Sequence, residues 1–313
     1  MRCRAPIAAF ALLAALLGAG EASAYCRSSV CKVEGQKATR GKMCSPPEDD
    51  DCGIALQWRQ PCLSFALEKN GSQQVKLAEI TKIARASFAA WTQTDCGGGD
   101  HPSITIDDFG TVSCDKVEYN KQDTHGGNVN VIVFRDEVWP HGDDGSGTTD
   151  TIALTTVTYD VVKGDIFDAD MEINTFENKF TTADTMVDVD LRSVLTHEAG
   201  HFLGLAHSTI AEATMFPNYM NGSVALRSLD DDDQQAICNA YPPDREAKGT
   251  CDGLPRHGFS PECLDAQTEG TCAMGPGAHG LSLAALLPAL ALFGLARRRG
   301  GRRTKVRSGS PGW

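Results

Sequence analysis

The chain has 313 residues with 41 acidic and 29 basic side chains, which gives a formal net charge of −12 at pH 7. The charge is uneven, because residues 25–280 carry 40 acidic against 20 basic side chains and a basic cluster lies near the C-terminus. This balance argues against nucleic-acid partners, since phosphate contacts need a positive surface.

Residues 1–24 have the order of a secretory signal peptide. Two arginines precede an apolar run over residues 7–17, and the small residues Ala22, Ser23 and Ala24 form a cleavage site. We expect this segment to be removed and the mature protein to be exported, to the outer cell surface or the extracellular space.

Residues 25–60 form a short cysteine-containing segment without a clear helical period. Because none of the eleven cysteines after the signal peptide is spaced as Cys-x-x-Cys, disulfides in an oxidising compartment are expected rather than a zinc ribbon. Ten of them precede the C-terminal tail and allow five bridges, with Cys272 left over, and the spacing leaves the pairing open. The cysteines after the signal peptide are Cys26, Cys31, Cys44, Cys52, Cys62, Cys96, Cys114, Cys238, Cys251, Cys263 and Cys272.

The next part of the chain alternates helix-like and strand-like segments. Residues 75–91 place apolar side chains close to a 3.6-residue period, which predicts a helix packed on a sheet. Residues 104–106 and 129–133 have the β-branched content of strands.

The segment from His197 to Ser208 carries the spacing of a catalytic zinc site. His197 and His201 are four residues apart, so they project from one face of a helix and can bind one ion, while Glu198 can reach the water on that ion. Gly204 can turn the chain in the left-handed conformation, which returns His207 as the third ligand. We expect Zn²⁺ as the cofactor, with Glu198 as the catalytic base.

Met215 lies eight residues after His207 and directly before Phe216-Pro217. This arrangement resembles the Met-turn of the metzincins, in which a methionine forms an apolar floor under the three histidines. With Ser208 after the third histidine, the pattern is similar to the matrixins, the matrix-metalloprotease-like branch of that group.

The resemblance implies an α+β catalytic domain over residues 61–243, with a zinc cleft in front of a twisted sheet. That sheet would be mostly parallel and five-stranded, with an antiparallel edge strand, and the domain would also contain three helices. The strands would lie near residues 63–67, 104–107, 129–134, 151–159 and 167–174. The resemblance also implies that the edge strand pairs with extended substrate and that the chain after Met215 walls a specificity pocket. The cleft residues expected on this basis are Ala153, Leu154, Thr155, Pro217 and Tyr219.

Three acidic segments invite a choice between metal sites and ordinary structure. Residues 141–147 resemble the matrixin loop that binds structural zinc and calcium, but glycine and aspartate also suit any turn, and we favour a plain loop. Asp165, Asp168 and Asp170 precede a strand and are candidate ligands for a structural Ca²⁺. Residues 230–233 are expected to cap the last helix and complement its dipole.

The C-terminal region divides into a cysteine-containing linker over residues 244–271 and a tail over residues 272–313. In the tail, Cys272 precedes an apolar run over residues 281–296 and then an arginine cluster. This order resembles the C-terminal sorting tails of myxobacterial surface proteins, which implies transient membrane contact and a processing enzyme that removes the tail. A simple membrane anchor is the alternative, although sixteen apolar residues are short of the roughly 20 that span a bilayer.

These observations predict an exported zinc endopeptidase that acts on protein or peptide substrates. Two other functions remain open. One is a zinc amidase acting on cell-wall peptide, and the other is a non-catalytic surface binding protein that retains the fold and the zinc. The carboxylate of Glu198 argues against the second, because a purely structural site has no use for it.

Overall fold

The computed structural model describes residues 25–31, 52–117, 119, 127–141, 151–263 and 308–309. The signal peptide therefore lies outside the described residues, as do most of the tail and the loop 142–150. Among the described residues, none of the helices has the length and apolar content needed to cross a bilayer.

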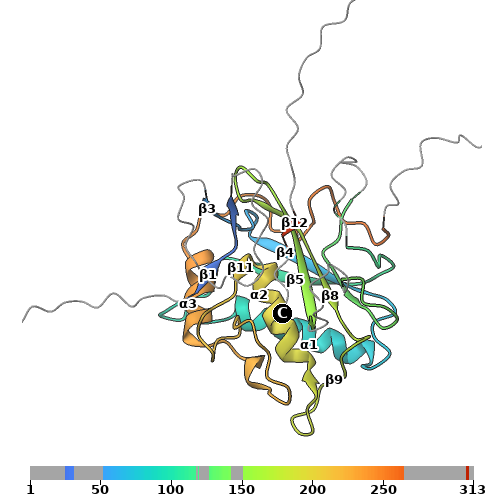
Figure 1. The fold of residues 1–313 in the computed structure, drawn as a ribbon. Coiled ribbons are helices and arrows are strands. Elements are labelled where there is room, and N and C mark those ends of the chain that lie inside the picture. The colour runs from blue at the N-terminus through green and yellow to red at the C-terminus, as the bar shows by residue number, and fades with distance from the viewer. Residues whose placement is uncertain are drawn as a thin grey trace, which may run out of the picture.

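The main sheet follows the predicted order of one strand, one long helix and four further strands (Figure 1). Its strands are β4 (Cys62–Glu68), β5 (Thr105–Val112), β6 (Val131–Phe134), β7 (Ala153–Tyr159) and β8 (Ile166–Ile173), arranged in the order β7-β8-β6-β4-β5. β4 pairs in parallel with β5 and β6, β6 pairs in parallel with β8, and β7 pairs antiparallel to β8. The predicted mostly parallel five-stranded sheet with an antiparallel edge strand is confirmed. A two-residue strand from the tail, β12 (Ser308–Gly309), pairs with β7 at Thr158 and Val157.

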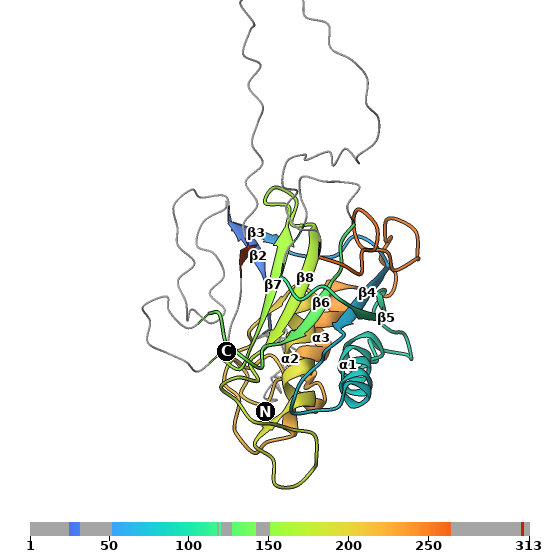
Figure 2. The same ribbon diagram turned by 90° about the vertical axis from the view of Figure 1, so that its right-hand side faces the viewer.

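Three α-helices are present in the described part of the chain: α1 (Leu77–Thr92), α2 (Leu191–Phe202) and α3 (Asp231–Ala240). Figure 2 shows the strands side by side in the order β7, β8, β6, β4 and β5. Helices α1 and α2 pack on the same side of these strands, because residues of both helices share the main core with the sheet. The helical period over residues 75–91 puts Ile80, Phe88 and Trp91 in the core between α1 and the sheet. This large core also contains Ala169, Met171 and Ile173, which alternate along β8.

The other face of the sheet has a smaller core, covered by the chain that follows α3. Val112, Val131 and Val133 pack there against Phe259. Three disulfides hold distant parts of the described chain together, and two of them attach residues 243–263 to the sheet. They join Cys62 to Cys251, Cys96 to Cys238 and Cys114 to Cys263.

Short strands complete the fold near α2. β1 (Cys26–Arg27) pairs antiparallel with β11 (Leu205–Ala206), and β2 (Ser29–Cys31) pairs antiparallel with β3 (Cys52–Ala55). β9 (Phe180–Thr181) pairs in parallel with β10 (Val189–Asp190), which leads directly into α2. A single 3-10 turn, η1 (Ala225–Arg227), precedes α3.

Candidate active site

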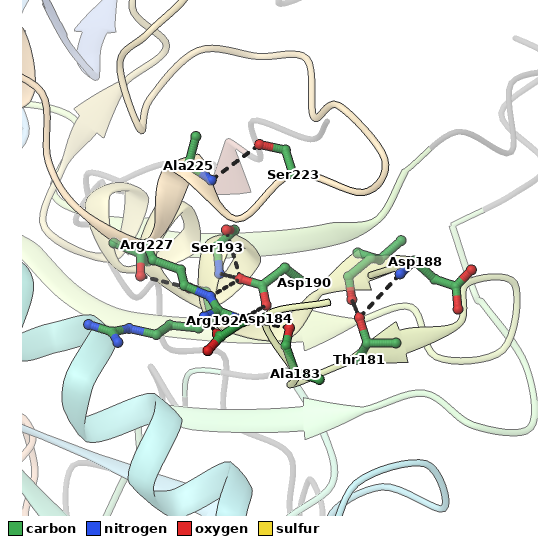
Figure 3. Close-up of polar contacts among 12 residues, drawn as sticks. Thr181, Ala183, Asp184, Asp188, Asp190, Arg192, Ser193, Ser223, Ala225 and Arg227 are labelled. Carbon is green, nitrogen blue, oxygen red and sulfur yellow. Dashed lines mark hydrogen bonds and ion pairs between the residues drawn. The ribbon is translucent and has the colours of Figure 1, made fainter. Parts of the chain in front are cut away.

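The helix that carries the zinc motif has a side-chain cap at its start and a tight glycine turn after its end. At its start, Asp190 is the N-cap, and its Oδ2 accepts hydrogen bonds from the backbone N and the hydroxyl of Ser193 (Figure 3). After its end, Gly204 has a φ of 85°, and a Cβ there would lie 2.7 Å from the carbonyl oxygen of Leu56. Glycine therefore suits this position for two reasons, its conformation and the close approach of another backbone.

The predicted turn brings the three histidines to one point. His197 Nε2 lies 3.0 Å from His201 Nε2, which lies 3.2 Å from His207 Nε2. His197 Nδ1 lies 2.6 Å from the carbonyl oxygen of Thr214, and His201 Nδ1 lies 2.9 Å from that of Leu205. Because carbonyls only accept, these two Nδ1 atoms carry the hydrogens, and both Nε2 atoms present lone pairs to the common point. Facing lone pairs at this separation repel unless a cation lies between them, so the donor set fits Zn²⁺.

The electrostatic environment keeps the three imidazoles neutral, as metal ligation requires. Burial, followed by the neighbouring imidazoles of His201 and His207, holds the pKa of His197 well below its ordinary value. Burial and the proximity of His207 lower the pKa of His201 to about 3. Burial alone lowers the pKa of His207 to about 4. In the described part of the chain, these three residues are the one set of three or more histidine, cysteine or acidic side chains whose ligand atoms converge closely enough to hold a metal ion.

Glu198 lies on the same helix as His197 and His201, and its side chain is fully buried. Thr155 of strand β7 donates a hydrogen bond from Oγ1 to Glu198 Oε2 over 2.5 Å. Thr155 is itself fully buried, so this contact joins the zinc-binding helix to the antiparallel strand.

Met215 lies against the zinc-binding helix, as expected for a Met-turn. A Cβ on Gly200 would be 2.2 Å from Met215 Sδ and 2.8 Å from Trp91 Cζ2, so these two side chains occupy the space that a side chain at this position would need. The turn is held by Asp233 of α3, which accepts hydrogen bonds from the backbone N atoms of Thr214 and Met215. One of those residues, Thr214, also provides the carbonyl that orients His197.

The chain after the Met-turn is tied to the N-terminus of α2. Figure 3 shows Arg227 reaching Asp190, with Nε 2.8 Å from Oδ2 and Nη2 2.6 Å from Oδ1. Arg227 also contacts the exposed carboxylate of Asp184. Tyr219, one of the expected cleft residues, accepts from the backbone N of Asp190 and donates to the carbonyl oxygen of Ser223. Pro217 lies beside it in the same loop and is partly buried.

The expected residues of strand β7 divide between the two faces of the sheet. Ala153 belongs to the main core and Thr155 faces α2, whereas Leu154 lines a cavity of about 810 Å³ on the other face. Glu172 also lines that cavity, where its Oε2 lies 2.6 Å from Nε2 of His141. The remainder of the loop that begins at His141, residues 142–150, lies outside the described residues.

The acidic side chains near β8 differ from the prediction in one respect. Asp168 and Asp170 lie within β8 rather than before it, and only Asp165 precedes the strand. Asp165 forms an ion pair with Arg59. Asp168 accepts a hydrogen bond from the amide of Asn128 and is fully buried, as is Asp170. The predicted cap of the last helix is confirmed, because the side chain of Asp230 accepts from the backbone N of Asp232 within a capping box.

Four residues support the site through contacts that were not predicted. Thr155 was expected only as a cleft residue, and Asp233 only as part of a helix cap, whereas Arg227 and Trp91 carried no functional prediction. Trp91 donates from Nε1 to the carbonyl oxygen of Thr196, one residue before the first ligand. Spacing along the chain has no signal for such contacts, because each joins segments that are distant in sequence.

Comparison with known proteins agrees with this geometry. The matrixin family model matches residues 57–242, more than half of the chain. Karilysin of Tannerella forsythia is 26% identical over 198 residues, which cover 62% of this chain and 36% of karilysin. Matrix metalloproteinase-2 of Drosophila melanogaster is 44% identical over 75 residues, covering 24% of this chain and 9% of that protein. Interstitial collagenase of Oryctolagus cuniculus is 53% identical over 49 residues, which cover 15% of this chain and 10% of that collagenase.

The chain thus spans well under two thirds of the length of these relatives. With the family model extending across the sheet, the three histidines and the Met-turn, the chain belongs to the matrixin family of zinc metalloendopeptidases.

Proposed function

We propose that this protein is an exported zinc-dependent endopeptidase that cleaves proteins or peptides with Glu198 as the general base. The observation that carries the proposal is the convergence of three histidine Nε2 atoms beside a buried carboxylate on the same helix. A structural zinc site is closed by its ligands and does not need such a carboxylate, whereas a hydrolytic site does.

His197, His201 and His207 would hold the ion. When bound, zinc would supply a Lewis acid for the scissile carbonyl and would lower the pKa of its bound water to about 7. Thr214 and Leu205 orient two of the imidazoles through their backbone carbonyls, which sets the tautomers that ligation needs.

Glu198 would move the proton in the reaction. Its carboxylate accepts a proton from the attacking water and then donates that proton to the nitrogen of the leaving amine. Because the side chain is buried, bulk water does not compete for this proton.

Strand β7 and the loop after the Met-turn would bind the substrate. An extended peptide can pair with the backbone of Ala153, Leu154 and Thr155 at the edge of the sheet, a common mode of peptide recognition. Pro217 and Tyr219 would form one wall of the adjacent specificity pocket.

The test of this function is Glu198→Gln in the zinc-loaded enzyme, with Glu212→Gln as the matched control at an exposed glutamate. We expect Glu198→Gln to retain zinc and to lose activity on a casein-type substrate by a factor on the order of 10²–10⁴. The control should remain active. Turnover close to that of the unmodified enzyme in Glu198→Gln would refute the role of this carboxylate.

The same assay separates the alternatives. A zinc amidase would digest purified peptidoglycan and leave casein intact, and a non-catalytic binding protein would digest neither. The proposed endopeptidase cleaves casein and loses that activity when a chelator removes zinc.

Export and tail processing are the cellular part of the proposal. Cleavage after Ala24 and removal of the tail near Cys272 would release the domain outside the cell, where its disulfides persist. The intact mass of the native protein tests this, because a species that retains residues 281–313 would favour a permanent anchor.

We also propose that a structural Ca²⁺ binds at Asp168 and Asp170. Burial, followed by the proximity of Asp168, raises the pKa of Asp170 well above its ordinary value, and its Oδ2 has no hydrogen-bond partner among the described residues. Calcium would supply the missing partner. A melting temperature that does not change on adding Ca²⁺ to the zinc-loaded enzyme would refute this site.

A further inference from the structure

Thr155 is the residue through which the antiparallel edge strand reaches the proposed catalytic base. Its Oγ1 lies 2.5 Å from Glu198 Oε2 and 3.3 Å from the backbone oxygen of Glu198. A hydroxyl has one hydrogen to donate, and the carboxylate is the nearer and the stronger of the two acceptors. The hydrogen bond to the carboxylate is therefore the principal one.

The surroundings of Thr155 are otherwise apolar. Its neighbours on the same face of β7 are Ala153 and Val157, and its cross-strand partner is Met171, all of them members of the main core. A hydroxyl buried among such side chains destabilises the fold unless it is hydrogen-bonded. The structure supplies that partner at Glu198, the residue that follows His197 on α2.

Thr155 is also a rigid donor. A β-branched side chain on a strand has a restricted χ1, and β7 is held in register with β8 from Ala153 to Tyr159. Glu198, in contrast, has a longer side chain with more rotatable bonds. A fixed hydroxyl that binds one carboxylate oxygen therefore limits the orientations of the whole carboxylate plane.

We propose that Thr155 is a positioning residue that holds the Glu198 carboxylate in its reactive orientation. The inference rests on the proposed function, because it assigns to Thr155 an effect that acts through the general base. It also places the support of the base on the strand proposed to pair with substrate, so that substrate binding and the orientation of Glu198 involve the same strand.

The experiment compares Thr155→Val, which removes the hydroxyl at similar volume, with Thr155→Ser, which keeps it. Thr175→Val is the matched control, because Thr175 is also buried and its Oγ1 has no hydrogen-bond partner among the described residues. Each zinc-loaded full-length enzyme is assayed for kcat, KM, zinc content and melting temperature.

We expect Thr155→Val to lower kcat by about 10- to 100-fold, as for other residues that orient a catalytic group. KM and zinc content should remain within about twofold of the unmodified enzyme, because the backbone of β7 that would pair with substrate and the three histidines are unchanged. Thr155→Ser should recover most of kcat, and Thr175→Val should leave it unchanged. If Thr155→Val does not fold, Thr155→Ala carries the same prediction.

Unchanged kcat in Thr155→Val would overturn the inference, as would a loss that appears only in KM or in zinc content. Glu198→Gln distinguishes this failure from failure of the proposed function. An inactive Glu198→Gln beside a fully active Thr155→Val refutes the positioning role alone, whereas an active Glu198→Gln refutes the general base itself. Combining Thr155→Val with Glu198→Gln should cause no further loss, because the two residues act as one unit.

Discussion

The ion pair between Arg227 and Asp190 is predicted to be the main electrostatic contribution to the zinc-binding helix. The Asp190 side chain is 0% exposed and that of Arg227 18% exposed, and the two form a bidentate contact. Arg227→Met would remove the cation and leave the buried carboxylate unpaired, which typically costs about 3–5 kcal/mol. We expect a value near the lower limit, because Asp190 keeps its two hydrogen bonds from Ser193.

The assay is urea unfolding of the zinc-loaded enzyme, followed by tryptophan fluorescence. Asp184→Asn is the control, since this second partner of Arg227 is 85% exposed and an exposed pair contributes only about 0–1 kcal/mol. Adding Asp190→Asn to Arg227→Met should recover part of the lost free energy of unfolding, because it neutralises the uncompensated charge. The reasoning is refuted if Arg227→Met loses no more stability than Asp184→Asn.

Three further predictions concern the packing, the pH dependence and the disulfides. Gly200→Ala should lower the melting temperature, because the added Cβ would clash with Met215 Sδ at 2.2 Å. This clash outweighs the gain of roughly 1 kcal/mol in helix propensity. A higher melting temperature in the variant would contradict the prediction. Burial raises the pKa of Asp168 to about 7, so its contribution to stability is full below about pH 4 and is lost as the pH rises through about 7. In calcium-free buffer, Asp168→Asn should therefore gain free energy of unfolding relative to the unmodified enzyme between pH 5 and pH 8, and a difference that does not vary with pH would count against the shift. Replacing both Cys114 and Cys263 with serine should lower the free energy of unfolding in urea by about 2–5 kcal/mol, because it opens a link between residues 149 apart. A decrease below about 1 kcal/mol would show that the smaller core on the other face of the sheet is stable without this disulfide.

The local parts of the site could be predicted from spacing alone. Two histidines four residues apart on a helix must share a face, and the glycine at Gly204 permits the turn that returns His207. The cap at Asp230 was equally readable, because capping depends on side-chain and backbone groups within one turn of the same helix. The helical period over residues 75–91 likewise predicted α1, which begins at Leu77.

The contacts that support the site were decided by the tertiary structure. Thr155 and Glu198 are 43 residues apart, and they meet because the face of β7 that carries Thr155 packs against α2. The composition of the acidic run at Asp233 suggested only a helix cap, yet the path of the preceding loop brings the Met-turn to it. The disulfide pairs depend on the same long-range geometry, since cysteine spacing permits many pairings and the fold selects those with adjacent Cα atoms. Local periodicity and capping arise from bonds within one helical turn, which sequence spacing determines. Strand register and loop path depend on how the whole core packs, so the residues that they bring together were visible only in the folded chain.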